Sequence, residues 1–449
     1  MKRKIQFGCA LLLLLPALAG CVGSGSTAAP LASGSAGLIP NTPISAAHTP
    51  ASETNTPACP TPAAESEQIP EGAKSYLHGE TGSRVLMSAA EIAAHNEKMK
   101  SACDALTDIL AIPASVSGST VAAYILSANA PALPKYKADG SALTEAEVAV
   151  YTENRNLKAI ARTVSVRMGI VTSRANLRAL PTETAFYKSA EARLYDQLQE
   201  TELLVGMPVW ILHTSTCGSF YYIQTYFYRG WVRTSHIAET EDAALWRSFA
   251  DPAEFAVVTA AAVQVPGTDI ILDMSVRLPV SEISEARCEV LLPVRNTQGM
   301  LTARSAALPK NAVSKGYLPY TKNNIYIQAF RYEGTPYGWG GAGGGVDCSS
   351  FIGNIYRTFG FLFPRNTSQQ RLVIGTVVSF SEAADDAAKA AQLSALEAPA
   401  VLFRPGHVML YLGLKDGSPY IIHAPSGGKT VTAEKLDKFS NLLSAALIS

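Results

Sequence analysis

The 449-residue sequence has little charge and no excess of either sign. Charged residues make up 16% of the chain, and 37 Lys and Arg residues balance 37 Asp and Glu residues. A balanced charge gives no electrostatic basis for binding nucleic acid along the whole chain, which leaves only a local cationic groove open. We therefore expect no nucleic-acid partner.

A hydrophobic run long enough to span a bilayer is also missing at the N-terminus. Leu11–Leu15 form a short apolar core that follows the basic residues Lys2–Lys4 and precedes the sequence Leu18–Cys21. This order is typical of a secretory signal. It resembles bacterial lipoprotein precursors, in which the cysteine is lipidated, although an ordinary cleaved signal is the alternative. We expect residues 1–20 to be removed, Cys21 to carry a lipid anchor, and the chain to be exported. Val22, rather than Asp, favours the periplasmic face of the outer membrane in a Gram-negative envelope.

Paired metal-binding cysteines are absent as well. Seven cysteines occur without a C-x-x-C spacing, which argues against a zinc site. Removal of Cys9 with the signal and lipidation of Cys21 leave five. An odd number in an oxidising compartment leaves one thiol unpaired or paired between molecules, which points to catalysis. The five are Cys59, Cys103, Cys217, Cys288 and Cys348, and a disulfide between Cys59 and Cys103 stays open.

Composition divides the rest of the chain. Residues 21–72 are Ala, Ser, Thr, Pro and Gly with almost no large apolar residues, so we expect a disordered tether. Over 73–160 the pattern turns helical, with Ser88 and Thr144 as N-cap candidates, which predicts a small helical N-terminal domain. Over 161–243 short alternating strands and Gly230-Trp231-Val232 resemble a bacterial SH3 domain, with any other small β-barrel as the alternative. Residues 244–310 repeat this texture more loosely, and we expect a second SH3-like barrel there.

The strongest chemical signal is Cys348. Asp347 is suited to be an N-cap, and Phe351, Ile352 and Ile355 after the cysteine fall on one helical face. This pattern places Cys348 in the first turn of a helix, where backbone N–H groups stabilise an anion. We therefore expect a thiol with a depressed pKa that acts as a nucleophile.

Two histidines supply a candidate base. His407 opens an apolar strand, Asp416-Gly417 make a turn, and His423 ends the returning strand. Histidines on adjacent strands could act in series, His407 taking the thiol proton and His423 orienting it. The alternative is a buried core thiol and two half-buried structural histidines. The glycine run at 340–345 lacks the Lys-Ser/Thr of a phosphate loop, so nucleotide binding is not expected.

Five motif blocks occur together in one order: Tyr337-Gly338-Trp339-Gly340-Gly341, Asp347-Cys348-Ser349-Ser350, Phe363-Pro364-Arg365-Asn366-Thr367-Ser368-Gln369-Gln370, Gly406-His407-Val408 and Ile422-His423-Ala424. This series resembles the NlpC/P60 family of cell-wall cysteine peptidases. With the SH3-like region, the chain is similar to γ-D-glutamyl-L-diamino-acid endopeptidases.

The resemblance implies a papain-like α+β catalytic domain over 311–449 that needs no metal or organic cofactor. It would cut the γ-D-glutamyl–diamino acid bond of peptidoglycan stem peptides. By motif, Cys348 is the nucleophile, His407 the base and His423 the orienting member. Tyr337 falls near the oxyanion, and Trp339 near the substrate.

The resemblance also implies a preference for a free N-terminal L-Ala. Its amine would be held by Asp347 and Ser349, and the pocket would be closed by an SH3 residue. The candidates for that residue are Tyr187, Tyr226 and Tyr228.

Two departures bear on the substrate pocket. The usual Gly-Asp-Leu turn is replaced by 397–402, and an Ala-rich helical insertion spans Ser381–Leu396. Two rival functions remain at this point: a non-catalytic peptidoglycan-binding lipoprotein, and an amidase or acyltransferase on the same fold. The oligomeric state is open.

Overall fold

The computed structural model describes residues 69–128, 132–191, 193–284 and 286–448. The expected signal segment, Cys21, Cys59 and nearly all of the expected tether lie outside these ranges. In the described ranges, no helix is both long and apolar enough to cross a membrane.

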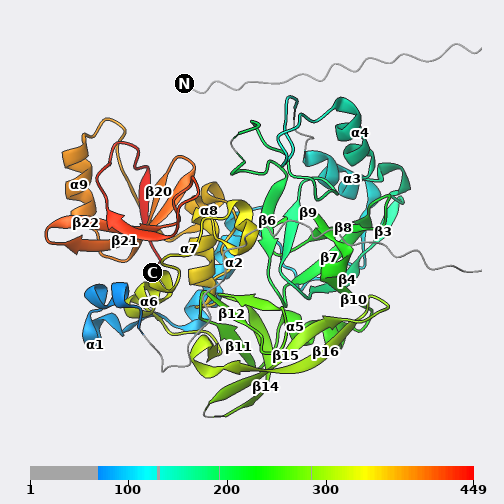
Figure 1. The fold of residues 1–449 in the computed structure, drawn as a ribbon. Helices are drawn as coiled ribbons and strands as arrows, with labels where there is room; N and C mark the ends of the chain where they lie inside the picture. Colours follow the sequence, from blue (N-terminus) through cyan, green and yellow to red (C-terminus); the bar gives the residue numbers. More distant parts are fainter. Residues whose placement is uncertain (1–68, 129–131, 192, 285, 449) are drawn as a thin grey trace, which may run out of the picture. The chain divides into compact units, whose positions relative to one another are not determined.

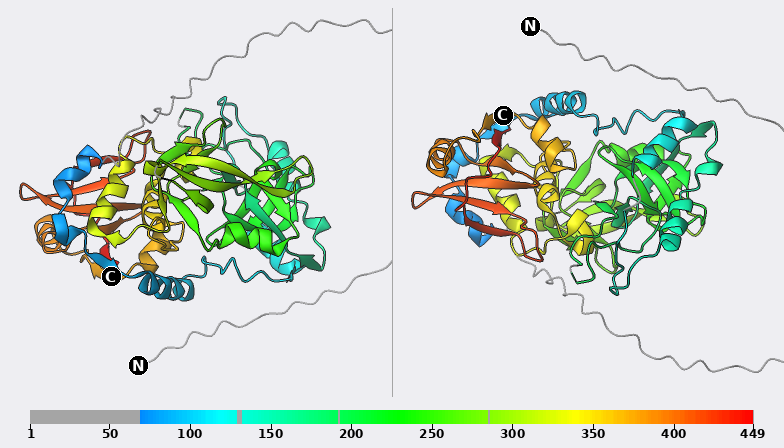
Figure 2. Two further views of the ribbon diagram at one scale, coloured as in Figure 1. Left: turned by 90° about the horizontal axis from the view of Figure 1, so that it is seen from below. Right: turned by 90° about the horizontal axis from the view of Figure 1, so that it is seen from above.

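The C-terminal domain is built on a six-stranded antiparallel sheet (Figure 1). One face packs against helices α6 and α7 through Val401, Val408 and Leu410. The other face carries a separate core with Leu393 of helix α9, which lies in the Ala-rich insertion. Figure 2 shows the same sheet and helices from two further sides. The strand order is β19 (Thr376–Ser379), β24 (Ser444–Leu447), β20 (Ala400–Arg404), β21 (His407–Lys415), β22 (Ser418–His423), β23 (Thr432–Lys435); the helices are α6 (Lys322–Arg331), α7 (Cys348–Arg357), α8 (Thr367–Val373) and α9 (Asp386–Ser394).

Helix α7 forms where the sequence predicts it. The Asp347 side chain accepts from the Ser350 N–H, and the Ser350 hydroxyl accepts from the Asp347 N–H, which makes a reciprocal capping box. Phe351, Ile352 and Ile355 are fully buried against the sheet. The cap and the buried face fix the first residue of the helix, Cys348.

The first barrel is a seven-stranded antiparallel sheet with its own apolar core, including Leu177, Val209 and Ile223. The residues expected in a late strand, Gly230-Trp231-Val232, lie in β9, and Trp231 is fully buried. The strand order is β10 (Ile237–Thr240), β4 (Arg167–Val171), β7 (Pro208–Thr214), β8 (Phe220–Gln224), β9 (Arg229–Arg233), β5 (Ala175–Arg178) and β6 (Gln199–Leu203).

A second β-region follows helix α5 (Ala243–Ala250) and encloses a separate core that includes Val258, Leu272 and Val290. Its five-stranded sheet extends to Lys315, a few residues beyond the expected boundary at 310. That it is an SH3-like barrel remains a prediction. The five-stranded order is β16 (Leu301–Pro309), β15 (Arg287–Arg295), β14 (Arg277–Ile283), β11 (Phe255–Val258) and β17 (Val313–Lys315), beside the hairpin of β12 (Ala262–Gln264) and β13 (Ile271–Asp273).

Residues 73–160 divide between two neighbours, which differs from the single helical unit expected. The earlier part packs on the catalytic domain, where β1 (Val85–Met87) pairs with β18 (Tyr320–Thr321) and Asn96 of α2 (Ala89–Ala102) donates to the Gly360 carbonyl. The later part packs on the first barrel, where Val121 and Ile125 of α3 (Gly118–Ser127) share a core with Trp231. Short helices with one apolar face need such a partner, because they cannot enclose a core alone.

Candidate active site

The thiol of Cys348 lies between the first turn of α7 and the start of β21. Its sulfur is 3.8 Å from the Thr367 hydroxyl and accepts from the backbone N–H of Val408, the residue after His407. The cysteine is 8% exposed. The fold therefore brings together the cysteine and the histidine strand, which are almost sixty residues apart in the chain.

The pKa of Cys348 differs from the expectation. Burial raises the pKa of this thiol above its ordinary value, and the negative charge of Asp347 raises it further. The Val408 N–H and the Thr367 hydroxyl act in the opposite direction without reversing the result. The expected depression of the pKa was wrong because the burial of the thiol, and after it the charge of Asp347, outweighs the stabilisation of an anion at the start of the helix. The resting thiol therefore depends on a neighbouring base for ionisation.

His407 and His423 form that neighbouring pair. Leu410 pairs with Ile422 across β21 and β22, so His423 lies diagonal to His407 on one face. The Nε2 of His407 is 2.8 Å from the Nδ1 of His423. This contact uses Nε2 of His407, so Nδ1 is the ring nitrogen that remains available to another partner.

Both histidines are held neutral. Burial lowers the pKa of His407 to about 4, helped by His423 and by the positive charge of Arg404. Burial likewise lowers the pKa of His423 to about 4, helped by Arg404 and Lys429. A neutral imidazole can accept a proton, so His407 has the state that a general base requires.

Tyr337 lies close enough to the thiol to interact with its charge, and Tyr337 and Trp339 both contact a tyrosine of the first barrel, Tyr195. Burial raises the pKa of Tyr337 well above its ordinary value, and so do the charges of Asp347 and Cys348. Its hydroxyl therefore stays protonated and can donate. Trp339 is 40% exposed, and its ring meets Tyr195 edge-on with centroids 5.3 Å apart. Tyr195 comes from the long β5–β6 loop and was missed from the sequence.

Asp347 and Ser349 are held in a buried ionic network. Arg365 donates to both carboxylate oxygens of Asp347, at 3.1 and 2.6 Å, and to the Ser349 hydroxyl at 2.8 Å. Burial alone would raise the pKa of Asp347, but Arg365 and the bonds from Ser350 hold it below its ordinary value. Arg365 lies in the third of the five motif blocks, but no role was predicted for it. Asp347 and Ser349, which were expected to bind the substrate amine, therefore already bind the guanidinium group of Arg365.

The first barrel supplies the rest of this network. Arg365 also donates to the Thr201 hydroxyl at 2.6 Å and lies 3.5 Å from the Glu202 carboxylate, both on β6. The glycine loop packs on the same strand, because a Cβ on Gly341 would fall 2.1 Å from a Glu202 oxygen. Gln199 donates to the Gly340 carbonyl at 3.0 Å. The loop that precedes the nucleophile is therefore shaped by contact with the barrel.

Of the three tyrosines considered as residues that close the pocket, Tyr228 is the one whose side chain reaches the segment next to Cys348. Its hydroxyl donates to the carboxylate of Glu200 on β6, and its side chain hydrogen-bonds Asn366, next to Thr367. Tyr226 instead accepts from Arg357 at the far end of α7, at 2.6 Å. Tyr187 pairs through its backbone with Tyr136. Glu200, like Tyr195, was not predicted from the sequence as a residue of the site.

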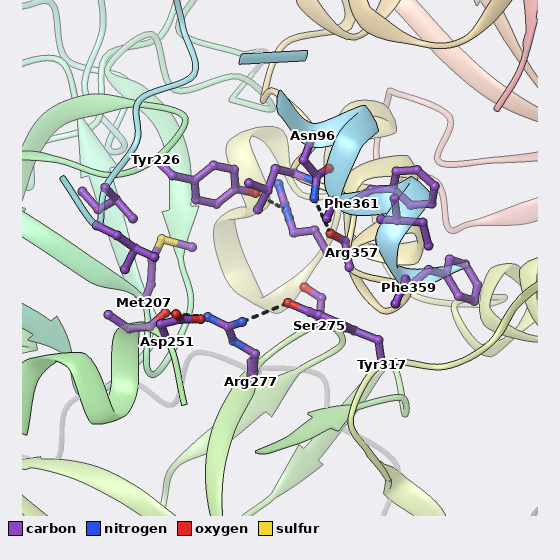
Figure 3. Close-up of a pocket in the computed structure, with 18 of the residues that line it drawn as sticks. Asn96, Met207, Tyr226, Asp251, Ser275, Arg277, Tyr317, Arg357, Phe359 and Phe361 are labelled. Carbon is purple, nitrogen blue, oxygen red and sulfur yellow. Dashed lines mark hydrogen bonds between the residues drawn. The ribbon is translucent and has the colours of Figure 1, made fainter. Parts of the chain in front are cut away.

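A cavity of about 600 Å³ lies apart from this site (Figure 3). Its lining includes the C-terminal end of α7, α2, and the turns before β7 and β14, whereas Cys348, His407 and His423 are not part of it. Figure 3 shows Arg357 reaching Tyr226 on one wall and Arg277 on another. The two ends of α7 thus have different surroundings.

In the described ranges, no three His, Cys, Asp or Glu side chains are grouped to hold a metal ion. Four cysteines in these ranges are free thiols: Cys103, Cys217, Cys288 and Cys348.

Comparisons with known proteins agree with this arrangement. Residues 334–441 match the NlpC/P60 family, and residues 184–233 match the SH3 domain of the SH3b1 type. The chain is 31% identical over 118 residues to dipeptidyl-peptidase 6 of Lysinibacillus sphaericus, a match that covers 26% of this chain and 37% of that protein. It is 28% identical over 180 residues to a probable endopeptidase of Corynebacterium glutamicum, which covers 40% of this chain and 79% of that one.

A solved NlpC/P60 endopeptidase from Photobacterium damselae subsp. piscicida shares the fold. The TM-score is 0.67 at 20% identity, with 84% of this chain and 96% of that chain covered. The likeness extends over the barrels as well as the C-terminal domain, since the catalytic domain alone is much shorter. By these matches the chain carries an NlpC/P60 domain over residues 334–441 and, ahead of it, an SH3 domain of the SH3b1 type over residues 184–233.

Proposed function

We propose that the chain is a cysteine endopeptidase that cuts the γ-D-glutamyl–diamino acid bond of peptidoglycan stem peptides. The observation that carries the proposal is the placing of Cys348 at the start of α7, against the Val408 N–H, beside the neutral pair of His407 and His423. The family supports peptide hydrolysis, and the bond is the one implied by the motif resemblance.

The chemistry follows from the atoms that the site leaves available. The Nδ1 of His407 takes the Cys348 proton as the sulfur attacks the carbonyl carbon, and the oxyanion accepts from the Cys348 N–H and the Tyr337 hydroxyl. His407 then returns the proton to the leaving amine, and a thioester remains on Cys348. Water, deprotonated by His407, attacks the thioester carbonyl and releases the γ-D-glutamyl carboxylate and the free thiol.

In this proposal, residues of the first barrel recognise a free N-terminal L-Ala. Asp347 and Ser349 accept hydrogen bonds from Arg365, so in this proposal they stabilise the wall of the substrate site and do not bind the ammonium. Glu200 receives the ammonium, and Tyr228 orients that carboxylate. Arg365, Asp347 and Glu202 together carry one net negative charge when all are ionised, which also favours a cation nearby.

The test uses protein beginning at residue 22 and the tripeptide L-Ala-γ-D-Glu-diaminopimelate. Mass spectrometry should show release of diaminopimelate, and Cys348→Ala should lower turnover by about 10⁴-fold while thermal unfolding stays cooperative. Cleavage by Cys348→Ala at the unaltered rate would overturn the mechanism. Products from sacculi but none from the tripeptide would overturn the proposed preference for a free N-terminal L-Ala.

A paired measurement tests the amine site. Glu200→Gln should lower kcat/KM for the free tripeptide by about 10- to 100-fold, because an ion-assisted hydrogen bond is lost. The N-acetylated tripeptide, which has no ammonium, should be cut slowly and equally by both proteins. Glu183→Gln, an exposed barrel carboxylate paired with Arg233, is the matched control. An equal loss on both substrates would contradict the assignment.

The expected lipid anchor at Cys21 and export to the cell envelope remain proposals that rest on the N-terminal sequence. Metabolic labelling with a palmitate analogue should mark the full chain and not its Cys21→Ser variant. Equal labelling of both would contradict the anchor.

A further inference from the structure

We propose that Glu434 is a fourth, positioning member of this site, which fixes the tautomers of His423 and His407 and so directs a basic nitrogen at Cys348. The inference rests on the proposed cysteine mechanism. It adds a residue that neither the sequence motifs nor the family resemblance singles out.

The register of three adjacent strands places these side chains in one diagonal row. His423 pairs with Thr432 across β22 and β23, so Glu434 lies two residues further along on the same face. The offset between Glu434 and His423 repeats the offset between His423 and His407. The Nε2 of His423 is 3.2 Å from a carboxylate oxygen of Glu434. The row therefore joins three polar groups by two hydrogen bonds.

Each hydrogen bond in the row fixes the next. A carboxylate only accepts, so Glu434 requires the proton of neutral His423 to sit on Nε2. The Nδ1 of His423 is then an acceptor and requires a proton on the Nε2 of His407. The remaining nitrogen of His407, Nδ1, is left with a lone pair. Without Glu434, either tautomer of His423 can form, and the opposite one would put the proton of His407 on the side of the thiol.

The charges around the row explain why a carboxylate is useful there. Arg404, across from His407 on β20, and Lys429, in the β22–β23 loop, both disfavour a proton on His423. These cations would also oppose the imidazolium that His407 becomes when it takes the thiol proton. Glu434 is the negative group that faces the row, and its side chain is 55% exposed, so solvent weakens its charge. We therefore expect a moderate effect, smaller than the loss of a buried triad member.

The experiment measures thiol activation without any peptide substrate. Alkylation of Cys348 by iodoacetamide is followed from pH 5 to pH 9 in the protein beginning at residue 22, with the other four cysteines, Cys59, Cys103, Cys217 and Cys288, replaced by Ser. Glu434→Ala and Glu434→Gln should slow alkylation at pH 7 about tenfold. Asp437→Asn, which removes an exposed carboxylate near Lys435, should leave the rate unchanged.

Nitrogen-15 spectra of the histidine rings give the readout that a purely structural role would not move. In the parent protein, His423 and His407 should each show one neutral tautomer with the proton on Nε2. In Glu434→Ala both tautomers of His423 should appear, while the unfolding temperature stays within about 2 °C, since the side chain is exposed. Unchanged tautomers and an unchanged alkylation rate in Glu434→Ala would overturn the proposal. Because neither readout needs a substrate, a failure to cut the tripeptide would count against the proposed function and not against Glu434.

Discussion

The two ends of α7 meet the first barrel by different means. At the N-terminal end, Arg365 joins the helix cap Asp347 to Glu202 in a network that is almost fully buried. At the C-terminal end, Arg357 bonds the Tyr226 hydroxyl beside a cavity of about 600 Å³. The buried charges need their partners in fixed places, whereas the looser end tolerates change. The comparison indicates that the structure is most constrained where the nucleophile is held.

The largest expected effect comes from removing the central cation at the constrained end. Arg365→Met leaves Asp347 and Glu202 buried without a counter-charge, so the free energy of unfolding should fall by about 3–5 kcal/mol. Urea unfolding followed by tryptophan fluorescence measures it. The double variant Arg365→Met, Glu202→Gln should recover part of the loss, because one of the two stranded charges is gone. A loss below about 1 kcal/mol in the single variant would contradict the role given to this network.

Acid should weaken the same end. His407 and His423 have pKa values of about 4 in the folded chain, below the ordinary value of 6.5. Between these pH values the unfolded chain binds more protons, so the free energy of unfolding should fall by about 2–3 kcal/mol for each histidine as pH is lowered from 6.5 to 4. Asp273, with a pKa raised to about 6 chiefly by burial, acts in the opposite sense. Urea unfolding of the parent protein and of a His407→Asn, His423→Asn double variant separates the contribution of the histidines from that of Asp273. If the free energy of unfolding depends on pH in the same way in both proteins, the histidines do not cause the loss in acid.

A matched pair of glycines tests the contact between the catalytic loop and β6. Gly341 and Gly343 both have positive φ, of 76° and 67°, so alanine strains the backbone of each in the same way. A Cβ added at Gly341 would clash with the side chain of Glu202, whereas a Cβ added at Gly343 would lie in open space. Gly341→Ala should therefore cost about 1–2 kcal/mol more than Gly343→Ala by urea unfolding. Equal costs would mean that the loop does not need its close approach to the barrel.

The smallest effect is expected at the other end of α7. Arg357→Met removes one hydrogen bond to Tyr226, one to Asn354, and the cation–π contact of the guanidinium with the Phe227 ring. The free energy of unfolding should fall by about 1 kcal/mol, and kcat/KM for the tripeptide should stay within twofold. A loss as large as that of Arg365→Met would remove the contrast between the two ends.

Features set by neighbours in the chain could be predicted from the sequence. Asp347 was expected as an N-cap and is one, since a cap depends on residues three apart. The strands that carry His407 and His423 were predicted from alternation and from the Asp416-Gly417 turn, and they pair as expected. The helix in the Ala-rich insertion also forms, although it packs on the core opposite to that of α7.

Features set by the meeting of domains could not be predicted. Glu200 and Glu202 are ordinary strand residues until β6 docks on the glycine loop, and no local pattern marks where it docks. The same docking brings Arg365 to Asp347, which explains why the expected open carboxylate is instead a buried ion pair. The prediction of a lowered pKa for Cys348 failed for the same reason, because the shift of this pKa depends on burial by segments that are remote in the sequence.

The packing of the glycine loop on β6 has a consequence for the order in which the protein is made. Translation runs from the N-terminus, so the barrel with β6 is complete before the loop at 337–345 and Cys348 leave the ribosome. When Cys348 is synthesised, the barrel surface that binds the residues around its helix cap has therefore already been made. A full-length chain whose barrel fails to fold would carry the cysteine without the wall that arranges it, so a correctly folded barrel is a condition for an active peptidase.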